Sequence, residues 1–496
     1  MEATTGKQEE AYYSQGLDTW AVPMSMHKEN RERLRQRFLD SEEGVPARSF
    51  VLLEGGKQTT RHDTDHEDLF RQESFFQYLF GCSESELYGA IDLTTGHSYL
   101  FMPRLPEEYA VWMGKIHPPE YLKQKYGVDD VFYVEDLEAK FTEWKASVLY
   151  VLNGLNTDSG NYAKPATFPG IEKFRVDNGR LHPELVECRV FKTAKEVELL
   201  RYVCKASSEA HITVMKAVKP GMTEYQLESL FLHEIYSRFG CRHVSYSCIC
   251  GSGPNGAILH YGTARCPNDK LIRDGDMLLM DMGGEYHCYG SDITCSYPAN
   301  GKFTDKQRFV YETVLAAVQA VEKAMKPGVS YPDMHRLAER VILTELTKYG
   351  LLRGSVDDMM KHYIANLFMP HGLGHFLGLD THDVGGYPRG AKRSSEPGLR
   401  SLRCGRVLAE GMVLTVEPGL YFIDAVLSKA LNNPEQAQFL VAEKIKEFMD
   451  FGGVRLEDDV LVTADGIEVL SQVPRAVEEI EAIMATGANF VPSTNH

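Results

Sequence analysis

The sequence predicts two consecutive domains that both combine helices and strands, an α/β chain in the broad sense that includes α+β. Its 496 residues exceed what a single hydrophobic core usually serves. Short strand-like segments alternate with helical ones in the first part of the chain, and long helical patterns followed by strands occur twice in the second part. Apolar residues make up 43% and charged residues 25%, which is typical of a folded globular protein.

The first part of the chain indicates a mixed α/β domain. Apolar segments with strand composition occur at 49–53, 87–92, 98–102 and 148–152, and helical patterns at 27–39 and 134–145. Thr94-Thr95-Gly96 is typical of a hairpin turn between two of these strands. Thr193 and Glu196 have the spacing of a capping box and open a long helical pattern. We expect a mobile lead-in at 1–18, a first domain at 19–188, a second at 189–486 and a flexible tail at 487–496.

The second part contains an internal sequence repeat. Lys216-Ala-Val-Lys-Pro-Gly-Met222 recurs 107 residues later as Lys323-Ala-Met-Lys-Pro-Gly-Val329. After each copy, Thr223 or Ser330 is a candidate N-cap for a further helix, which ends near Gly240 or Gly350. Lys-Pro-Gly is also a frequent helix stop, so chance can repeat it. The matching flanks favour a duplicated half-domain whose two copies bring side chains to one central sheet.

Charge and composition exclude several classes of function. The formal net charge of −17 argues against binding of nucleic acid, which relies on clustered Lys and Arg. No apolar run reaches about 18 residues, so we expect no membrane-spanning helix. The ten cysteines form no Cys-x-x-Cys pair and are expected to be free core thiols. The N-terminus lacks the pattern of a signal peptide, which favours a cytoplasmic protein.

Two aspartates come eleven residues apart in the second domain. Asp281 follows the apolar run Met277–Met280 and precedes two glycines, so it ends a buried strand beside a tight turn. Asp292 begins a stretch whose alternation places it on one face of a strand with Thr294 and Ser296. Either aspartate alone is compatible with a turn cap or a solvated strand residue. A hairpin that carries both can direct them at one cation.

Three further metal-ligand types follow in short motifs. His371 and His375 have the spacing of helix-borne zinc ligands, but Gly372 and Gly374 argue against a helix. These glycines instead allow close backbone packing while both imidazoles face one cavity. Glu417 follows the apolar strand 411–416, and Glu457 follows Gly453-Val-Arg-Leu456. A carboxylate at the end of an apolar strand needs a partner.

Four buried carboxylates close together would repel one another strongly, and each desolvated charge costs several kcal/mol. Two divalent cations remove this objection. Ligation by oxygen atoms and one imidazole suits manganese(II) better than a thiolate-seeking metal. Two such ions can share a bridging water, lower its pKa and polarise a carbonyl. The sequence therefore predicts a hydrolytic metalloenzyme with Asp281, Asp292, His375, Glu417 and Glu457 as its ligands.

With these residues in this order, the chain resembles the pita-bread metallopeptidases, a family that also includes methionine aminopeptidase, aminopeptidase P and creatinase. Over about 45–480 it is most similar to the prolidase branch, which cleaves Xaa-Pro dipeptides. The stretches that carry the similarity lie at 69–76, 112–117, 368–378 and 382–388. The resemblance implies a pseudo-twofold pita-bread catalytic domain behind the first α/β domain. It also implies substrates that include Xaa-hydroxyproline, and hence a link to collagen metabolism.

The resemblance further implies a role for each residue. Asp281 would bind one ion, His375 and Glu417 the other, and Asp292 and Glu457 both. Glu417 would shuttle the proton of the bridging water or hydroxide to the leaving nitrogen, and His371 would stabilise the oxyanion or assist proton transfer. The implied substrate-binding residues are Tyr246, His260, His382 and Arg403, with Arg403 paired to the free proline carboxylate.

Two of the implied residues have simpler explanations from the sequence alone. Arg403 could be a surface arginine in a basic loop, and Trp112 could pack in the core. The resemblance instead places Trp112 beside the pocket of a second subunit and implies a homodimer. One local departure from the family pattern is the segment 261–267, which leaves the conformation after His260 open.

Two other functions compete with dipeptide hydrolysis. An enzyme like aminopeptidase P would remove the first residue from longer Xaa-Pro peptides. A catalytically inactive pita-bread domain would bind peptides or proteins. The carboxylate partner Arg403 favours dipeptides, and the complete set of five ligands disfavours the inactive domain.

Overall fold

The computed structural model describes residues 10–487, which divide into two compact units, Met1–Glu196 and Val197–His496. Residues 1–9 and 488–496, which are half of the predicted lead-in and nearly all of the predicted tail, lie outside the described part. Within the predicted lead-in, strand β1 (Tyr12–Tyr13) pairs antiparallel with β2 (Val22–Pro23). The predicted domain boundary at 188/189 falls inside helix α6 (Leu181–Val190), and the two units separate after Glu196.

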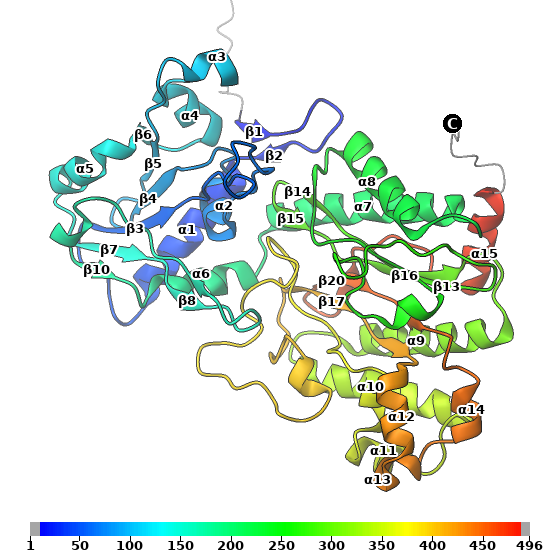
Figure 1. Cartoon of the computed structure of the whole chain (residues 1–496). Helices are drawn as coiled ribbons and strands as arrows, with labels where there is room; N and C mark the ends of the chain where they lie inside the picture. The colour runs from blue at the N-terminus through cyan, green and yellow to red at the C-terminus, as the bar shows by residue number, and fades with distance from the viewer. Residues whose placement is uncertain (1–9, 488–496) are drawn as a thin grey trace, which may run out of the picture. The chain divides into compact units, whose positions relative to one another are not determined.

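The first unit is built on a mixed six-stranded sheet (Figure 1). Its strands are ordered β10-β7-β3-β4-β5-β6, with antiparallel pairing on both sides of β4 and parallel pairing elsewhere. The strands are β3 (Ser49–Glu54), β4 (Tyr88–Asp92), β5 (Ser98–Met102), β6 (Asp130–Tyr133), β7 (Val148–Val151) and β10 (Val176–Asp177), with β8 (Gly154–Leu155) and β9 (Tyr162–Ala163) as a separate pair. The helices are α1 (Ser25–Asp40), α2 (Ser74–Phe80), α3 (Tyr109–Met113), α4 (Pro119–Tyr126), α5 (Leu137–Glu143) and α6.

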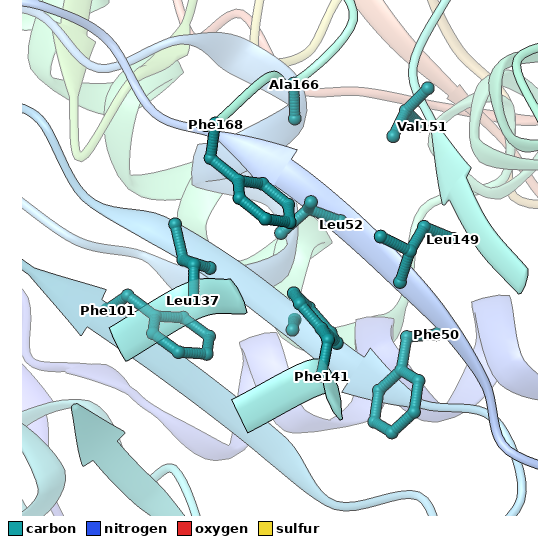
Figure 2. Packing of buried hydrophobic residues seen from close by; sticks show 10 residues of the cluster. Phe50, Leu52, Phe101, Leu137, Phe141, Leu149, Val151, Ala166 and Phe168 are labelled. Atoms are coloured by element: carbon teal, nitrogen blue, oxygen red, sulfur yellow. The ribbon is translucent and has the colours of Figure 1, made fainter. Parts of the chain in front are cut away.

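One face of this sheet is covered by an aromatic core around α5. Phe141 of α5 meets Phe50 of β3 edge to face, with ring centroids 5.4 Å apart, and lies 6.1 Å from Phe101 of β5. Trp144, at the end of α5, stacks on Phe50 and on Tyr99. Figure 2 shows Phe50, Phe101 and Phe141 with other buried side chains of this cluster over the sheet. The predicted strands, the helix near 134–145 and the hairpin at Gly96 are confirmed.

The second unit repeats one order of elements, helix pair and then three strands. Helices α7 (Ala194–Ala217) and α8 (Glu224–Phe239) precede the antiparallel sheet β12-β13-β16, and α9 (Asp305–Ala324) and α10 (Tyr331–Tyr349) precede the sheet β17-β20-β21. In Figure 1 the two helix pairs flank these strands. The strands are β12 (Ile249–Ser252), β13 (Met277–Asp281), β16 (Thr294–Pro298), β17 (Val413–Val416), β20 (Asp458–Val462) and β21 (Ile467–Val469). The predicted duplication is therefore confirmed.

The remaining elements of the second unit are short. The strands are β11 (His243–Val244), β14 (Gly284–Tyr286), β15 (Tyr289–Gly290), β18 (Gly419–Tyr421) and β19 (Gly453–Arg455), and the helices are α11 (Val356–Lys361), α12 (Asp424–Leu431), α13 (Pro434–Ala437), α14 (Ala442–Lys446) and α15 (Val477–Thr486). Within residues 10–487, no helix combines the length and the hydropathy needed to cross a membrane.

Local sequence signals set the ends of the repeated helices as expected. Thr223 and Gln226 form a capping box at the start of α8, and Ser330 precedes α10. Gly240 and Gly350 end the two helices in the left-handed region, at φ 69° and 86°. A side chain is strained in that conformation, which explains glycine at both positions.

The two halves meet through their strands. Thr294 at the start of β16 forms an isolated antiparallel bridge with Glu457, which immediately precedes β20. Ser296 of β16 donates a hydrogen bond from its hydroxyl to the carbonyl of Arg455 at 2.9 Å. This contact places the segment with Asp281 and Asp292 beside the segment with Glu457.

Replacement of Phe141 by alanine should destabilise the first unit by about 3–5 kcal/mol, because a buried aromatic cluster loses its central ring. All three tryptophans of the chain lie in this unit, so tryptophan fluorescence during denaturant unfolding reports on it selectively. Tyr162→Ala, at a side chain that is 68% exposed, is the matched control and should change stability by less than about 0.5 kcal/mol. Equal effects of the two substitutions would contradict this description of the core.

Candidate metal centre

One cavity of about 700 Å³ in the second unit gathers the predicted residues. All five predicted metal ligands contribute to its lining: Asp281, Asp292, His375, Glu417 and Glu457. Four of them are at most 7% exposed, and Glu417 is 18% exposed at its side chain. The strands of both halves thus deliver acidic groups to one largely buried space.

Asp281 is the last residue of β13 and is held by two donors. The hydroxyl of Tyr246 donates to its Oδ1 at 2.6 Å, and the guanidinium of Arg455 donates to its Oδ2 at 2.5 Å. Burial raises the pKa of Asp281 to about 6, although the charge of Arg455 opposes this rise. Both oxygen atoms are therefore oriented before any ion is bound.

Asp292 lies between β15 and β16 and is held through its backbone. Its N–H donates to Oδ2 of Asp459 at 3.0 Å, and its own Oδ2 lies 3.3 Å from Nε2 of His375. Its Oδ1 is buried and has no hydrogen-bond partner within the described residues. The predicted position on a strand is wrong, because β16 begins two residues later, at Thr294.

His375 presents one ring nitrogen to the carboxylates. Its Nδ1 lies 3.0 Å from the carbonyl oxygen of Phe376, which can only accept, so Nδ1 keeps a proton and Nε2 is the nitrogen that a metal ion would bind after losing its proton. Nε2 lies 3.5 Å from Oε1 of Glu417. Burial lowers the pKa of His375, but the hydrogen bond to Asp292 and the nearby acids prevail and raise it to about 9.

The glycines around His375 are required by close packing. A Cβ at Gly374 would lie 2.2 Å from the carbonyl oxygen of Thr415, and one at Gly372 would lie 2.6 Å from the Cα of Leu402. The backbone N–H of His375 also donates to the hydroxyl of Thr415 at 3.2 Å. The loop therefore fits against the strand that precedes Glu417, as the glycine pattern predicted.

The two glutamates are buried in surroundings that disfavour their ionised form. Glu457 accepts a hydrogen bond from the hydroxyl of Thr294 at 2.6 Å, and burial together with the neighbouring acids raises its pKa well above the usual range. Burial likewise raises the pKa of Glu417 to about 7, although the charge of His375 opposes this. Without cations, the site therefore favours protonated glutamates.

These residues fit divalent metal ions. One ligand atom each of Asp292, His375 and Glu457 falls within 4.8 Å of the others, a spacing that allows a common ion. The buried, unpartnered Oδ1 of Asp292 is the kind of orphaned acceptor that an ion satisfies. Carboxylate oxygens with one neutral imidazole form a donor set for manganese or a similar ion.

Arg455 is a buried residue that the sequence reasoning missed. Besides Asp281, it donates to the hydroxyl of Tyr421 at 2.8 Å and to that of Thr294 at 3.1 Å. Its guanidinium offsets part of the acidic charge next to the ligands. An arginine two residues before Glu457 in an otherwise apolar strand was the available signal, because alternate strand residues share a face.

His371 lines the same cavity but both ring nitrogens contact protein atoms. Nδ1 lies 2.7 Å from the carbonyl oxygen of Gly372, and Nε2 lies 2.9 Å from the hydroxyl of Tyr421. Burial, assisted by the charge of Arg455, lowers the pKa of His371 to about 3, so the ring is neutral. With its proton on Nδ1, a hydrogen bond to an oxyanion would require the contact with Gly372 to open.

The predicted substrate-binding side chains of the second unit share this cavity. Tyr246, His260, His382 and Arg403 all contribute to its lining. The rings of His382 and His375 meet edge to face, with centroids 4.5 Å apart. Burial, the charge of His375 and the charge of Arg403 together lower the pKa of His382 to about 3. A neutral His382 beside the cation Arg403 can face a carboxylate.

Trp112 is located differently from the other predicted residues. It lies on α3 in the first unit, and its side chain is 83% exposed. Core packing, the simpler explanation of this tryptophan, is therefore wrong. The neighbouring Val111 and Met113 are exposed as well, at 76% and 56%.

Comparison with known proteins agrees with this geometry. Residues 198–464 match the model of metallopeptidase family M24, and residues 27–150 match that of the aminopeptidase P N-terminal domain. The Xaa-Pro dipeptidase of Homo sapiens is 60% identical over 470 residues, which is 95% of each chain. A probable Xaa-Pro aminopeptidase of Verticillium alfalfae is 35% identical over 89% of this chain and 94% of its own.

Solved structures show the same fold. Aminopeptidase PepP of Pseudomonas aeruginosa matches with a TM-score of 0.76 and 32% identity, over 95% of this chain and 99% of that one. Zinc-substituted Escherichia coli aminopeptidase P in complex with product matches with a TM-score of 0.74 and 31% identity, over 93% and 99%. The chain therefore belongs to metallopeptidase family M24, with an aminopeptidase P type N-terminal domain followed by a pita-bread catalytic domain.

Proposed function

We propose that this chain is a dinuclear-metal dipeptidase that hydrolyses Xaa-Pro and Xaa-hydroxyproline dipeptides. The relatives named Xaa-Pro dipeptidase support this proposal, because those of Homo sapiens and Rattus norvegicus are 60% and 58% identical over 95% of this chain. The matched region covers 95% of this chain and therefore extends along both domains.

The observation that carries the proposal is that Arg403 lines the same cavity as the five predicted ligands. An arginine pairs well with a carboxylate, by two parallel hydrogen bonds. In a dipeptide, the carboxylate of proline lies one residue beyond the bond to be cleaved, so a nearby guanidinium can select substrates that end there. His382 adds a neutral donor beside it.

Each proposed ligand has its own role in binding the two metal ions. Asp281 would hold one manganese(II) ion, His375 and Glu417 would hold the other, and Asp292 and Glu457 would be ligands of both. When bound, the two ions lower the pKa of a shared water and polarise the scissile carbonyl. Glu417, a cavity-lining carboxylate, would serve as the group that takes up a proton and passes it to the leaving imino nitrogen. Tyr246 orients Asp281 through its hydrogen bond to Oδ1.

Aminopeptidase P activity is the second candidate, because similar solved structures carry that name and the relatives at 34–36% identity are named probable Xaa-Pro aminopeptidases. It requires room beyond the proline for a longer chain. A carboxylate partner within the cavity favours the shorter substrate, and so does the higher identity to the dipeptidases.

The homodimer, manganese as the metal, and the cytoplasmic location stay predictions. The exposed Trp112 with its exposed apolar neighbours on α3 supports a contact with a second copy of the chain. The resemblance to dipeptidases that act on hydroxyproline peptides supports the link to collagen metabolism.

Purified protein loaded with manganese should hydrolyse Gly-Pro but not Gly-Pro-Ala, because the tripeptide places no carboxylate at the proline. Release of glycine from both peptides is measured under the same conditions. Turnover of the tripeptide alone would identify an aminopeptidase P activity. Inactivity on both, with no bound metal, would favour a peptide-binding domain.

Arg403→Ala should raise KM for Gly-Pro by about tenfold or more, since a charge-assisted contact contributes about 1.5–3 kcal/mol. Arg403→Lys should recover part of this loss, because a lysine keeps the charge but not the paired geometry. Arg400→Ala, at an exposed arginine of the same loop, is the control and should leave KM unchanged. An unaltered KM in Arg403→Ala would exclude the proposed role.

Asp292→Asn should abolish most of the thermal stabilisation that added manganese gives to the metal-free protein, because a neutral amide cannot balance the charge of the ions. Differential scanning calorimetry with and without metal measures this shift in Tm. Glu410→Gln, at an exposed acid of the same unit, should retain the wild-type shift. A full metal-dependent shift in Asp292→Asn would remove it from the ligand set.

A further inference from the structure

His260 reaches the cavity from an irregular loop. The segment 253–270, between β12 and β13, contains only a short 3-10 turn at Gly253–Ala257. His260 is itself exposed, and its ring makes no hydrogen bond within residues 10–487. Its position therefore depends on what holds the rest of the loop.

One buried carboxylate makes hydrogen bonds to several parts of this loop. Glu224 is the first residue of α8 and is completely buried. The four residues that hydrogen-bond to its carboxylate all lie between 252 and 270: Ser252, Asn255, Tyr261 and Lys270. It thus connects a helix to both ends and the middle of the loop.

The contacts satisfy both oxygen atoms of Glu224. Oε1 accepts from the backbone N–H of Ser252 at 2.8 Å, from its hydroxyl at 2.6 Å and from the amide of Asn255 at 3.1 Å. Oε2 accepts from the hydroxyl of Tyr261 at 2.7 Å and from the backbone N–H of Lys270 at 3.2 Å. The positive end of the α8 dipole adds to the stabilisation of this charge.

Because Tyr261 is hydrogen-bonded to Glu224, it restrains the backbone of His260, its neighbour in the chain. Its side chain is 4% exposed, and its hydroxyl also accepts a hydrogen bond from the amide of Asn255 at 2.8 Å. The buried ring therefore has a fixed depth and orientation. Since His260 and Tyr261 share a peptide bond, the direction in which His260 leaves the backbone is fixed with it.

Glu224 has no other evident task in the proposed reaction. It does not contribute to the lining of the cavity, and its carboxylate makes no hydrogen bond to the five predicted ligands in the described part of the chain. Its hydrogen bonds are made to the segment 252–270, which also contributes Leu259, His260, Tyr261 and Thr263 to the cavity wall.

We propose that Glu224 is a positioning residue for substrate binding, which fixes His260 at the cavity by anchoring Tyr261 and both ends of the loop. This inference rests on the proposed function, because it assumes that His260 contacts the dipeptide.

Glu224→Gln should raise KM for Gly-Pro by about tenfold while kcat and bound metal stay within about twofold of the wild type. The amide has nearly the same size, but its NH2 group faces a donor, the N–H of Lys270 or that of Ser252. Tyr261→Phe, which removes a single donor and keeps the carboxylate, should give a smaller rise in KM. Glu198→Gln, at an acid of α7 whose side chain is 51% exposed, is the control and should match the wild type.

A double-mutant cycle with His260→Ala separates positioning from general stability. If Glu224 acts through His260, adding Glu224→Gln to His260→Ala should cause little further rise in KM. Full additivity, or an equal loss of kcat and bound metal in Glu224→Gln, would overturn the inference. Wild-type turnover of Gly-Pro in the same assay tests the proposed function separately. If the wild type cleaves only a longer Xaa-Pro peptide, the cycle is measured on that peptide.

Discussion

Mutual repulsion among buried carboxylates is the constraint on which the catalytic unit depends. Asp281, Asp292, Glu417 and Glu457 line one cavity, and burial raises the pKa of three of them. The fold keeps the acids together through donors that do not block the cavity, namely the hydroxyls of Tyr246 and Thr294 and the guanidinium of Arg455. The remaining negative charge is what attracts divalent cations, so the same arrangement that is costly without metal gives the site its affinity.

In the duplicated architecture, the four repelling carboxylates come from two different half-domains. The first half supplies Asp281 and Asp292, and the second supplies His375, Glu417 and Glu457. Each half supplies two of the four acidic ligands. The full repulsion arises only where β16 meets the segment of Glu457, and there Arg455 and the hydroxyl of Thr294 are already in place. The contact between the two halves thus brings together the acidic ligands and the donors that stabilise them.

Local sequence signals predicted much of this structure. Capping residues and Pro-Gly stops gave the repeated helix pairs, and apolar runs that end in an acid gave the positions of Asp281, Glu417 and Glu457. Periodicity failed for Asp292, because hydrogen bonding to Asp459, 167 residues away, shapes that segment. The same reason hid Arg455 and Tyr421, whose partners are distant in the chain. For Trp112 the sequence alone favoured core packing, since a tryptophan in an apolar pentapeptide is usually buried, whereas the resemblance placed it beside a second subunit.

Residues that pair in the site are synthesised at different times, because they are far apart in the chain. The backbone of Asp292 is paired with the side chain of Asp459, and Asp281 with Arg455, 174 residues further along. At about 5–20 residues per second, the ribosome needs roughly 10–30 s to deliver the second partner after the first. During that interval the nascent first half must survive with its two aspartates in water and the edge of β16 uncovered. The completed chain covers this edge where Thr294 pairs with Glu457, so the contact that forms the cavity also protects a strand edge against pairing with another chain.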